Sequence, residues 1–136
     1  MTGQREAILS ALIKKDEMNL RTLPYHLSVA KYSSVPFPLS GFYTLSVAEG
    51  EISLVGESER LPQGYTHRED GWRALYIDAQ LDFSLVGVLA GISSALAENG
   101  IPLFAISTYD TDYLLVKEGD FGAACAALKI KGYIII

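Results

Sequence analysis

Two amphipathic segments in the second half of the chain limit the folds that it can adopt. Residues 83–100 (FSLVGVLAGISSALAENG) carry apolar side chains at helical spacing and end in Asn99-Gly100, a typical helix stop. Residues 120–131 (DFGAACAALKIK) show a second such pattern, with Asp120 as the expected N-cap. Both segments are therefore expected to be helices. Their predicted inward faces are Leu85, Val88, Leu89, Ile92 and Leu96 in the first, and Phe121, Ala124, Cys125 and Leu128 in the second.

Short apolar runs flank the two predicted helices. They are residues 72–78, 101–107, 112–118 and 132–136, and aromatic or β-branched side chains are frequent in them. The order from Trp72 onward is thus strand, helix, strand, strand, helix, strand. This order predicts an α+β fold of the ferredoxin-like βαββαβ type, in which an antiparallel sheet has both helices on one face.

The first half of the chain has a β-rich pattern after a short amphipathic segment at residues 5–15. Residues 25–32 alternate polar and apolar side chains, with Leu27 and Val29 on the predicted inward face. Residues 42–57 predict a hairpin around Gly50. We therefore divide the chain into a helical extension at 1–18, a β-rich unit at 19–70 and a βαββαβ unit at 71–136.

Composition excludes several function classes. The net charge is −5 and the pI is about 4.9, so the clustered Lys and Arg of a nucleic-acid-binding surface are not expected. Cys125 is the only cysteine, and His26 and His67 lie far apart, so neither an internal disulfide nor a metal site is predicted. The sequence has no phosphate-binding glycine loop or nucleophile elbow, and no cofactor is expected.

Targeting signals are also not evident. The N-terminal segment lacks the uninterrupted apolar stretch of a signal peptide, and no segment reaches the roughly 20 apolar residues that cross a bilayer. We therefore expect a cytoplasmic protein with no membrane partner.

The start of the first predicted helix and the segment STYDTD (107–112) together suggest a binding site. The first turn of a helix, predicted near Ser84, leaves backbone N–H groups free to bind an α-carboxylate, and Gly87 lets a ligand approach the backbone. A carboxylate such as Asp112 could then bind an α-ammonium group. Other interpretations stay open: Gly87 and Gly91 can serve close packing, and Asp82 can be a helix cap. The aspartates of the segment are also common turn residues, and Ser107 and Thr108 can be exposed strand residues.

The motif VGVLAGISSALAENGIPLFAIS (86–107) resembles the core of an ACT domain, with a glycine at the helix start and Gly100-Ile101 before the next strand. The segments 81–92 and 106–118 together are similar to compact tandem-ACT proteins related to the CASTOR arginine sensors. The resemblance implies ferredoxin-like ACT domains in tandem, with an abbreviated N-terminal ACT-like unit at 19–70.

The resemblance also implies a function. It suggests a sensory or regulatory protein, not an enzyme, that binds an amino acid between two ACT units and forms a homodimer. Where the arginine sensors have a glutamate shortly before the helix glycine, this chain has Leu85, so a cationic ligand side chain would lack that partner. The second hypothesis for the function is an interaction module that binds no small ligand, and the third is an enzyme. The implied ligand-binding residues are Asp82, Phe83, Leu85, Val86, Gly87, Ser107, Thr108, Tyr109 and Asp112.

Overall fold

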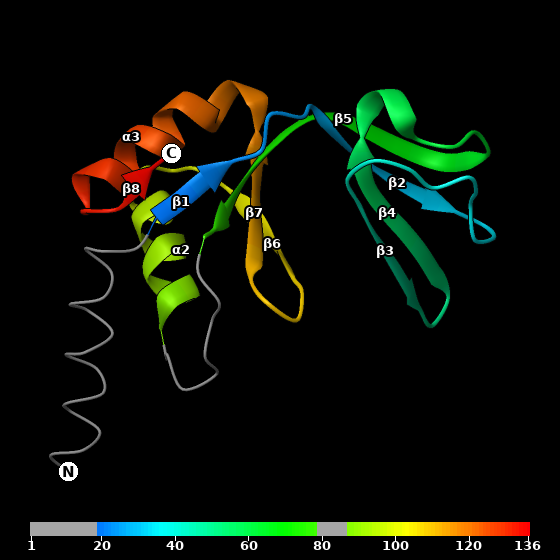
Figure 1. Cartoon of the computed structure of the whole chain (residues 1–136), viewed down its shortest axis with the longest axis horizontal. Helices are drawn as coiled ribbons and strands as arrows, with labels where there is room; N and C mark the ends of the chain where they lie inside the picture. Colours follow the sequence, from blue (N-terminus) through cyan, green and yellow to red (C-terminus); the bar gives the residue numbers. More distant parts are fainter. Residues whose placement is uncertain (1–18, 79–86) are drawn as a thin grey trace, which may run out of the picture. The chain divides into compact units, whose positions relative to one another are not determined.

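The structure, a computed structural model, describes residues 19–78 and 87–136 (Figure 1). The predicted helix at 5–15 and four predicted site residues, Asp82, Phe83, Leu85 and Val86, lie outside this range. The strands are β1 (Asn19–Thr22), β2 (Leu27–Tyr32), β3 (Tyr43–Ala48), β4 (Glu51–Glu57), β5 (Tyr65–Ile77), β6 (Leu103–Ser107), β7 (Asp112–Lys117) and β8 (Ile134–Ile135). The helices are α2 (Val88–Glu98) and α3 (Phe121–Ile130), with 3₁₀ turns η1 (Ser58–Arg60) and η2 (Glu118–Asp120).

The chain divides into two compact units. Residues 24–73 form one, which we call the β unit, and residues 74–136 together with the N-terminal segment through Leu23 form the other, which we call the α/β unit. The long strand β5 contributes to both, because its first part pairs with β2 and its last part with β1. The predicted division at residues 18 and 70 stays a prediction; the compact units place β1 with the C-terminal segment.

The α/β unit has the predicted element order, β5-α2-β6-β7-α3-β8. β6 and β7 form an antiparallel hairpin, β7 pairs with β5, and β1 lies between β5 and β8. β1 is the additional strand, which inserts between the first and last strands of the predicted βαββαβ motif. The predicted α+β, ferredoxin-like fold class is therefore confirmed.

Both helices of the α/β unit pack on one face of its sheet. Strand residues Leu114 and Val116 are buried against helix residues Ile92 and Leu128, each at most 1% exposed. Fully burying side chains of this size stabilises the fold by about 1.5–3 kcal/mol each, so this face dominates the stability of the unit. The inward residues predicted for both helices are confirmed within the described range: Val88, Leu89, Ile92 and Leu96 in α2, and Phe121, Ala124, Cys125 and Leu128 in α3.

The helix starts differ from the predictions in detail. The described helix α2 begins at Val88, with Gly87 in a left-handed conformation just before it, and the predicted start near Ser84 lies outside the described residues. Asp120 occupies the predicted N-cap position of α3, but its side chain makes no capping hydrogen bond. A 3₁₀ turn leads directly into α3, which keeps Asp120 in a helical conformation instead of the extended one that capping side chains usually need.

The β unit is built around the predicted hairpin of β3 and β4, which is confirmed. β4 also pairs with β2, and β2 pairs with β5. Its small core contains Ala30, Tyr32 and Leu54. The predicted inward face of β2 is confirmed at Leu27, which is buried, but not at Val29, which is only half-buried. Ser28, Ala30 and Tyr32, on the opposite face of the strand, are buried as well.

Candidate functional site

The STYDTD segment forms the turn between β6 and β7. Ser107 and Asp112 are direct partners in the register of the two strands, and the Ser107 hydroxyl donates a hydrogen bond of 2.5 Å to Oδ1 of Asp112. Thr108 closes the turn, because its backbone N–H donates to the Thr111 carbonyl at 2.8 Å. The segment therefore reverses the chain and also presents a carboxylate held by a hydroxyl.

Asp112 lies on the helix-covered face of the sheet. Side chains alternate along a strand, so Asp112 shares a face with Leu114 and Val116, which pack against the helices. Asp112 is half-buried, whereas Asp110 in the turn is exposed. An ionised carboxylate can accept about four hydrogen bonds, and Ser107 supplies one of them. Asp112 thus keeps acceptor capacity for a further donor.

Thr111 ties this turn to the end of β5. Its hydroxyl donates a hydrogen bond of 2.8 Å to the carbonyl of Ile77, the last residue of that strand. On the same pair of strands, Tyr76 and Tyr113 pack with ring centroids 5.3 Å apart. Burial raises the pKa of the Tyr113 hydroxyl, with smaller contributions from Tyr76 and Asp110. The end of β5 and the start of β7 therefore lie together at one edge of the α/β unit.

An ion pair adds to this edge. Asp78 directly follows β5, and its Oδ2 accepts a hydrogen bond of 2.5 Å from Nε of Arg21 in β1. The hydrogen bond to Asp78 raises the pKa of Arg21 further, and the nearby negative charge adds to this effect. Both side chains are more than a third exposed, so the pair contributes little to stability and mainly orients the strand end.

Gly87 has a conformation that requires glycine. Its φ is +87°, and a Cβ placed on it would meet no atom of the described residues within 4 Å. This backbone conformation favours glycine by itself, whereas at Gly91 the Tyr133 hydroxyl lies 3.2 Å from the position of an added Cβ. Gly87 leads the chain into α2, an apolar helix of 11 residues whose first turn has N–H groups without partners inside the helix.

Among the predicted ligand-binding residues, the structure brings Ser107 and Asp112 together, with Thr108 in the same turn. Tyr109, in the same turn, is 86% exposed. Within the described residues, no hydrogen bond joins Gly87 to Ser107 or Asp112. The other four lie in 82–86, outside the described residues, so the ligand-binding assignment as a whole stays a prediction.

Sequence reasoning missed three contributors at this edge: Thr111, Arg21 and Asp78. The signal for Asp78 was available, because a carboxylate directly after a buried strand is often positioned at a functional edge. Arg21 could not be found this way, since its partner lies 57 residues away in the sequence.

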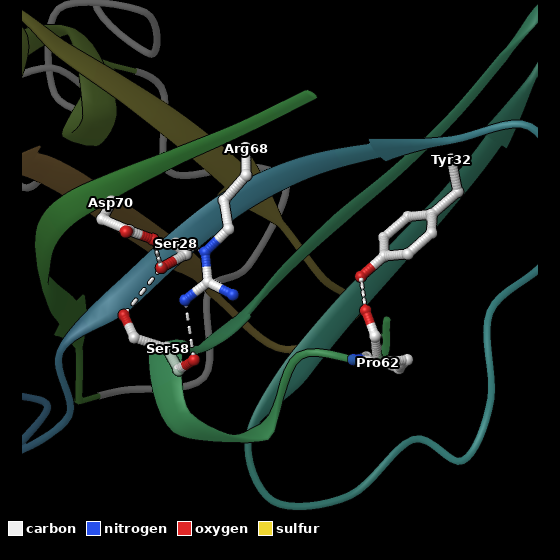
Figure 2. A network of polar contacts seen from close by, with 6 residues as sticks. All are labelled: Ser28, Tyr32, Ser58, Pro62, Arg68 and Asp70. Carbon is white, nitrogen blue, oxygen red and sulfur yellow. Dashed lines mark hydrogen bonds and ion pairs between the residues drawn. The ribbon is translucent and has the colours of Figure 1, made fainter. Parts of the chain in front are cut away.

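A second polar cluster, in the β unit, was also missed (Figure 2). Ser28 is fully buried and hydrogen-bonds Ser58 Oγ at 2.7 Å and Asp70 Oδ1 at 2.5 Å. Arg68 Nε donates to the same Asp70 oxygen at 2.7 Å, and another guanidinium nitrogen donates to the Ser58 carbonyl at 2.9 Å. The hydrogen bond from Ser28, followed by that from Arg68, lowers the pKa of Asp70. This cluster fixes η1 to β2 and β5, which is a structural role.

The described ranges, 19–78 and 87–136, lack two further features. They contain no group of three or more His, Cys, Asp and Glu side chains that could hold a metal ion. They also contain no helix with the length and apolar character that spanning a membrane requires.

The α/β unit defines a class of protein, the small ferredoxin-like α+β domains with two helices on one face of an antiparallel sheet. More specifically, residues 67–129 match the model of the ACT domain family, and the chain therefore belongs to that family. The match includes the end of β5, both helices and the complete β6–β7 turn.

Curated relatives include the cytosolic arginine sensor for mTORC1 subunit 1 of Homo sapiens, which is 33% identical over 105 residues covering 71% of this chain. The same protein of Mus musculus is 32% identical over 95 residues, or 65% of this chain. The chain spans about a third of the length of these relatives, 32% and 29% respectively.

Solved structures share the fold. A crystal structure of a protein from Agobacterium tumefaciens has a TM-score of 0.77 and 27% identity, with 88% of this chain and 92% of that chain covered. The aspartate kinase of Clostridium acetobutylicum has a TM-score of 0.60 at 10% identity, over 85% of this chain and 34% of the kinase. The second comparison supports the fold alone.

Proposed function

We propose that this chain is a regulatory protein that senses a small molecule by binding an amino acid at its ACT domain, without catalysis. Support comes from the match of residues 67–129 to the ACT family and from relatives that are named as arginine sensors. Because the chain spans only about a third of those relatives (32%), their whole activity is not assumed for it.

The observation that carries the proposal is the Ser107–Asp112 pair. A half-buried carboxylate held by one hydroxyl, at the helix-covered edge of the sheet, suits an α-ammonium group, because charge-assisted hydrogen bonds are short and strong. Asp112 would bind the ammonium group and Ser107 would keep the carboxylate in position.

The opposite end of the ligand would bind at the start of α2. Backbone N–H groups of a first helical turn carry a partial positive charge and suit a carboxylate. Gly87 has no side chain to cover this backbone, and no atom of the described residues lies within 4 Å of where its Cβ would be. The resemblance assigns contacts also to Asp82, Phe83, Leu85 and Val86, and it places the ligand between two ACT units; both remain predictions.

The ligand side chain is the open part of the proposal. Arginine is the first amino acid to test, because the relatives are named as its sensors. Leu85 in place of the sensors' glutamate instead favours a ligand with a neutral side chain. Titration with arginine, leucine and glutamine in parallel distinguishes these alternatives.

We also propose a homodimer in the cytoplasm. The cellular location follows the relatives, which are named as cytosolic. The dimer follows from the resemblance.

A thermal-shift screen tests the proposed function. A ligand that binds only the folded state raises the melting temperature with concentration, because it adds about 2.7 kcal/mol of stability at 100 times the Kd. We expect at least one of the twenty amino acids to give such a saturable shift. If none of them shifts the melting temperature, the amino-acid proposal is wrong.

A further inference from the structure

The strand β3 forms one end of the strand order in the sheet of the β unit (Figure 1). Its pairing with β4 is regular from Tyr43↔Gly56 to Ala48↔Glu51, without a bulge. Within the described residues, no backbone hydrogen bond joins β3 to any element other than β4. One side of β3 therefore presents backbone donors and acceptors to its surroundings.

The sequence of β3 lacks the usual protection of an edge strand. Edge strands of stable monomers are commonly blocked by charges, prolines or bulges. β3 reads Tyr-Thr-Leu-Ser-Val-Ala and contains neither a charge nor a proline. Two of its apolar side chains are exposed, Tyr43 by 42% and Val47 by 65%. A regular, uncharged edge of this kind is suited to pairing with another strand.

We propose that β3 is the surface through which two copies of this chain associate, pairing antiparallel across a two-fold axis at Leu45. In this register Leu45 faces Leu45 of the second copy, and Tyr43 faces Val47. Directly opposite residues of an antiparallel pair have their side chains on the same face, so this register brings the exposed apolar residues of each copy together. The inference rests on the homodimer proposed above, whose interface it locates, and it is independent of the proposed amino-acid binding.

The apolar face of β3 continues the core of the β unit. Leu45 packs against the cluster of Ala30, Tyr32 and Leu54, and strand alternation puts Tyr43 and Val47 on the same face as Leu45. A second copy would extend this core over both exposed side chains. A strand from an unrelated partner would need a matching apolar spacing, whereas the second copy has it by symmetry.

Charges beyond the strand are complementary in the same register. The pairing that joins Leu45 to its counterpart brings Glu49, which directly follows β3 in one copy, toward Gly41, which precedes β3 in the other. The side chains of Glu57 and Arg60 both lie beside Gly41, and of this ion pair Arg60 is the more exposed partner, 54% against 16%. The exposed Glu49 would therefore approach an ion pair whose positive partner is the more accessible one.

Analytical ultracentrifugation of the full chain tests the proposal. We expect the wild-type chain to show a concentration-dependent equilibrium of monomer and dimer, since a contact of this size is at the weak end of specific interfaces. Val47→Lys should weaken the dimer by about tenfold or more, because it places a lysine in the apolar pair. Tyr43→Lys should do the same from the other side of that pair. Circular dichroism checks that both variants are folded.

The double variant Tyr43→Glu/Val47→Lys tests the register. The glutamate introduced in one copy would face the lysine introduced in the other, so dimerisation should recover at low salt relative to Val47→Lys alone. Within one strand the two positions are about 13 Å apart and cannot pair. Ile130→Lys, at a residue of the α/β unit that is 84% exposed, is the matched control and should leave the dimer intact. A wild-type monomer at all concentrations, an unchanged dimer in Val47→Lys, or no recovery in the double variant would overturn the proposal.

Discussion

Ser107 donates a hydrogen bond of 2.5 Å to Asp112, its direct neighbour across the β6–β7 pair. The bond holds the carboxylate on the helix-covered face of the ACT domain, where the proposed ligand would meet it. Ser107 is therefore expected to act through Asp112 and not only as a turn residue.

Ser107→Ala should weaken amino-acid binding about three- to tenfold, because the loss of one such hydrogen bond costs about 1 kcal/mol. Fluorescence or calorimetric titration measures the change. Ser53→Ala is the control, since it also removes a hydroxyl bonded to a carboxylate, in this case Glu51 of the β3–β4 hairpin at 2.8 Å. Equal loss of affinity in both variants would contradict a specific role for Ser107.

Gly87→Ala should destabilise the ligand-free chain by about 1–2 kcal/mol, since an alanine in the left-handed region is strained. The expected cause is the φ of +87°, because the added methyl group would contact no atom of the described residues. Urea unfolding measures the difference. Gly122→Ala, in α3 and also without neighbours within 4 Å of the added Cβ, should instead stabilise by about 0.5 kcal/mol. If both variants change stability in the same direction, the backbone explanation is incorrect.

The polar cluster in the β unit predicts an acid-dependent loss of stability. The pKa of Asp70 is below its ordinary value of 3.8, through the hydrogen bond from Ser28 and then that from Arg68. A carboxylate with a lowered pKa stabilises the folded state above the unfolded pKa and loses this contribution as pH falls through the folded pKa. Wild-type chain and Asp70→Asn should therefore differ in stability at pH 7, and the difference should shrink as pH falls below the ordinary pKa of 3.8.

Urea unfolding across this pH range checks the prediction. Asp110→Asn changes an exposed carboxylate in the β6–β7 turn and should follow the wild-type curve. A gap between wild type and Asp70→Asn that stays constant with pH would rule out the proposed contribution.

Thr111→Val should cost about 1 kcal/mol of stability, because it keeps the side-chain shape but removes the 2.8 Å hydrogen bond to the Ile77 carbonyl. Thr66→Val removes two exposed contacts, a 3.2 Å bond to the Lys31 carbonyl and a 3.0 Å contact with His67 Nδ1, and should cost less because water can replace both. Thermal unfolding of both variants gives the comparison. Equal costs would indicate that the Thr111 bond does not anchor the turn.

Much of the ACT unit was predictable because its elements have strong local signals. The apolar stripe of α2, its end at Asn99-Gly100 and the glycine at its start, Gly87, can each be recognised within a short stretch of the sequence. The order of strands and helices then permits few topologies. The place of β1 between β5 and β8 was not predictable, since it depends on a pairing between residues more than 100 positions apart.

Other features of the fold depend on how the strands pair, which the pattern of apolar and polar residues does not specify. The buried face of β2 was predicted only in part, because an alternating pattern assumes one covered face, whereas Leu27 and Ser28, on opposite faces, are both fully buried. The direct opposition of Ser107 and Asp112 follows from the turn length, which sequence reasoning recognised as a turn but did not convert into a register. The exposed edge of β3 is likewise visible only once the strand order is known.

Isothermal titration of the amino acid that gives the largest thermal shift tests the central claim most directly. The wild-type chain should bind it saturably, and Asp112→Asn should bind it at least about tenfold more weakly, because a neutral amide loses the charge-assisted hydrogen bond to the ammonium group. Asp110→Asn, two residues away in the exposed turn, should bind like wild type. Asp112→Asn binding with wild-type affinity would contradict the account.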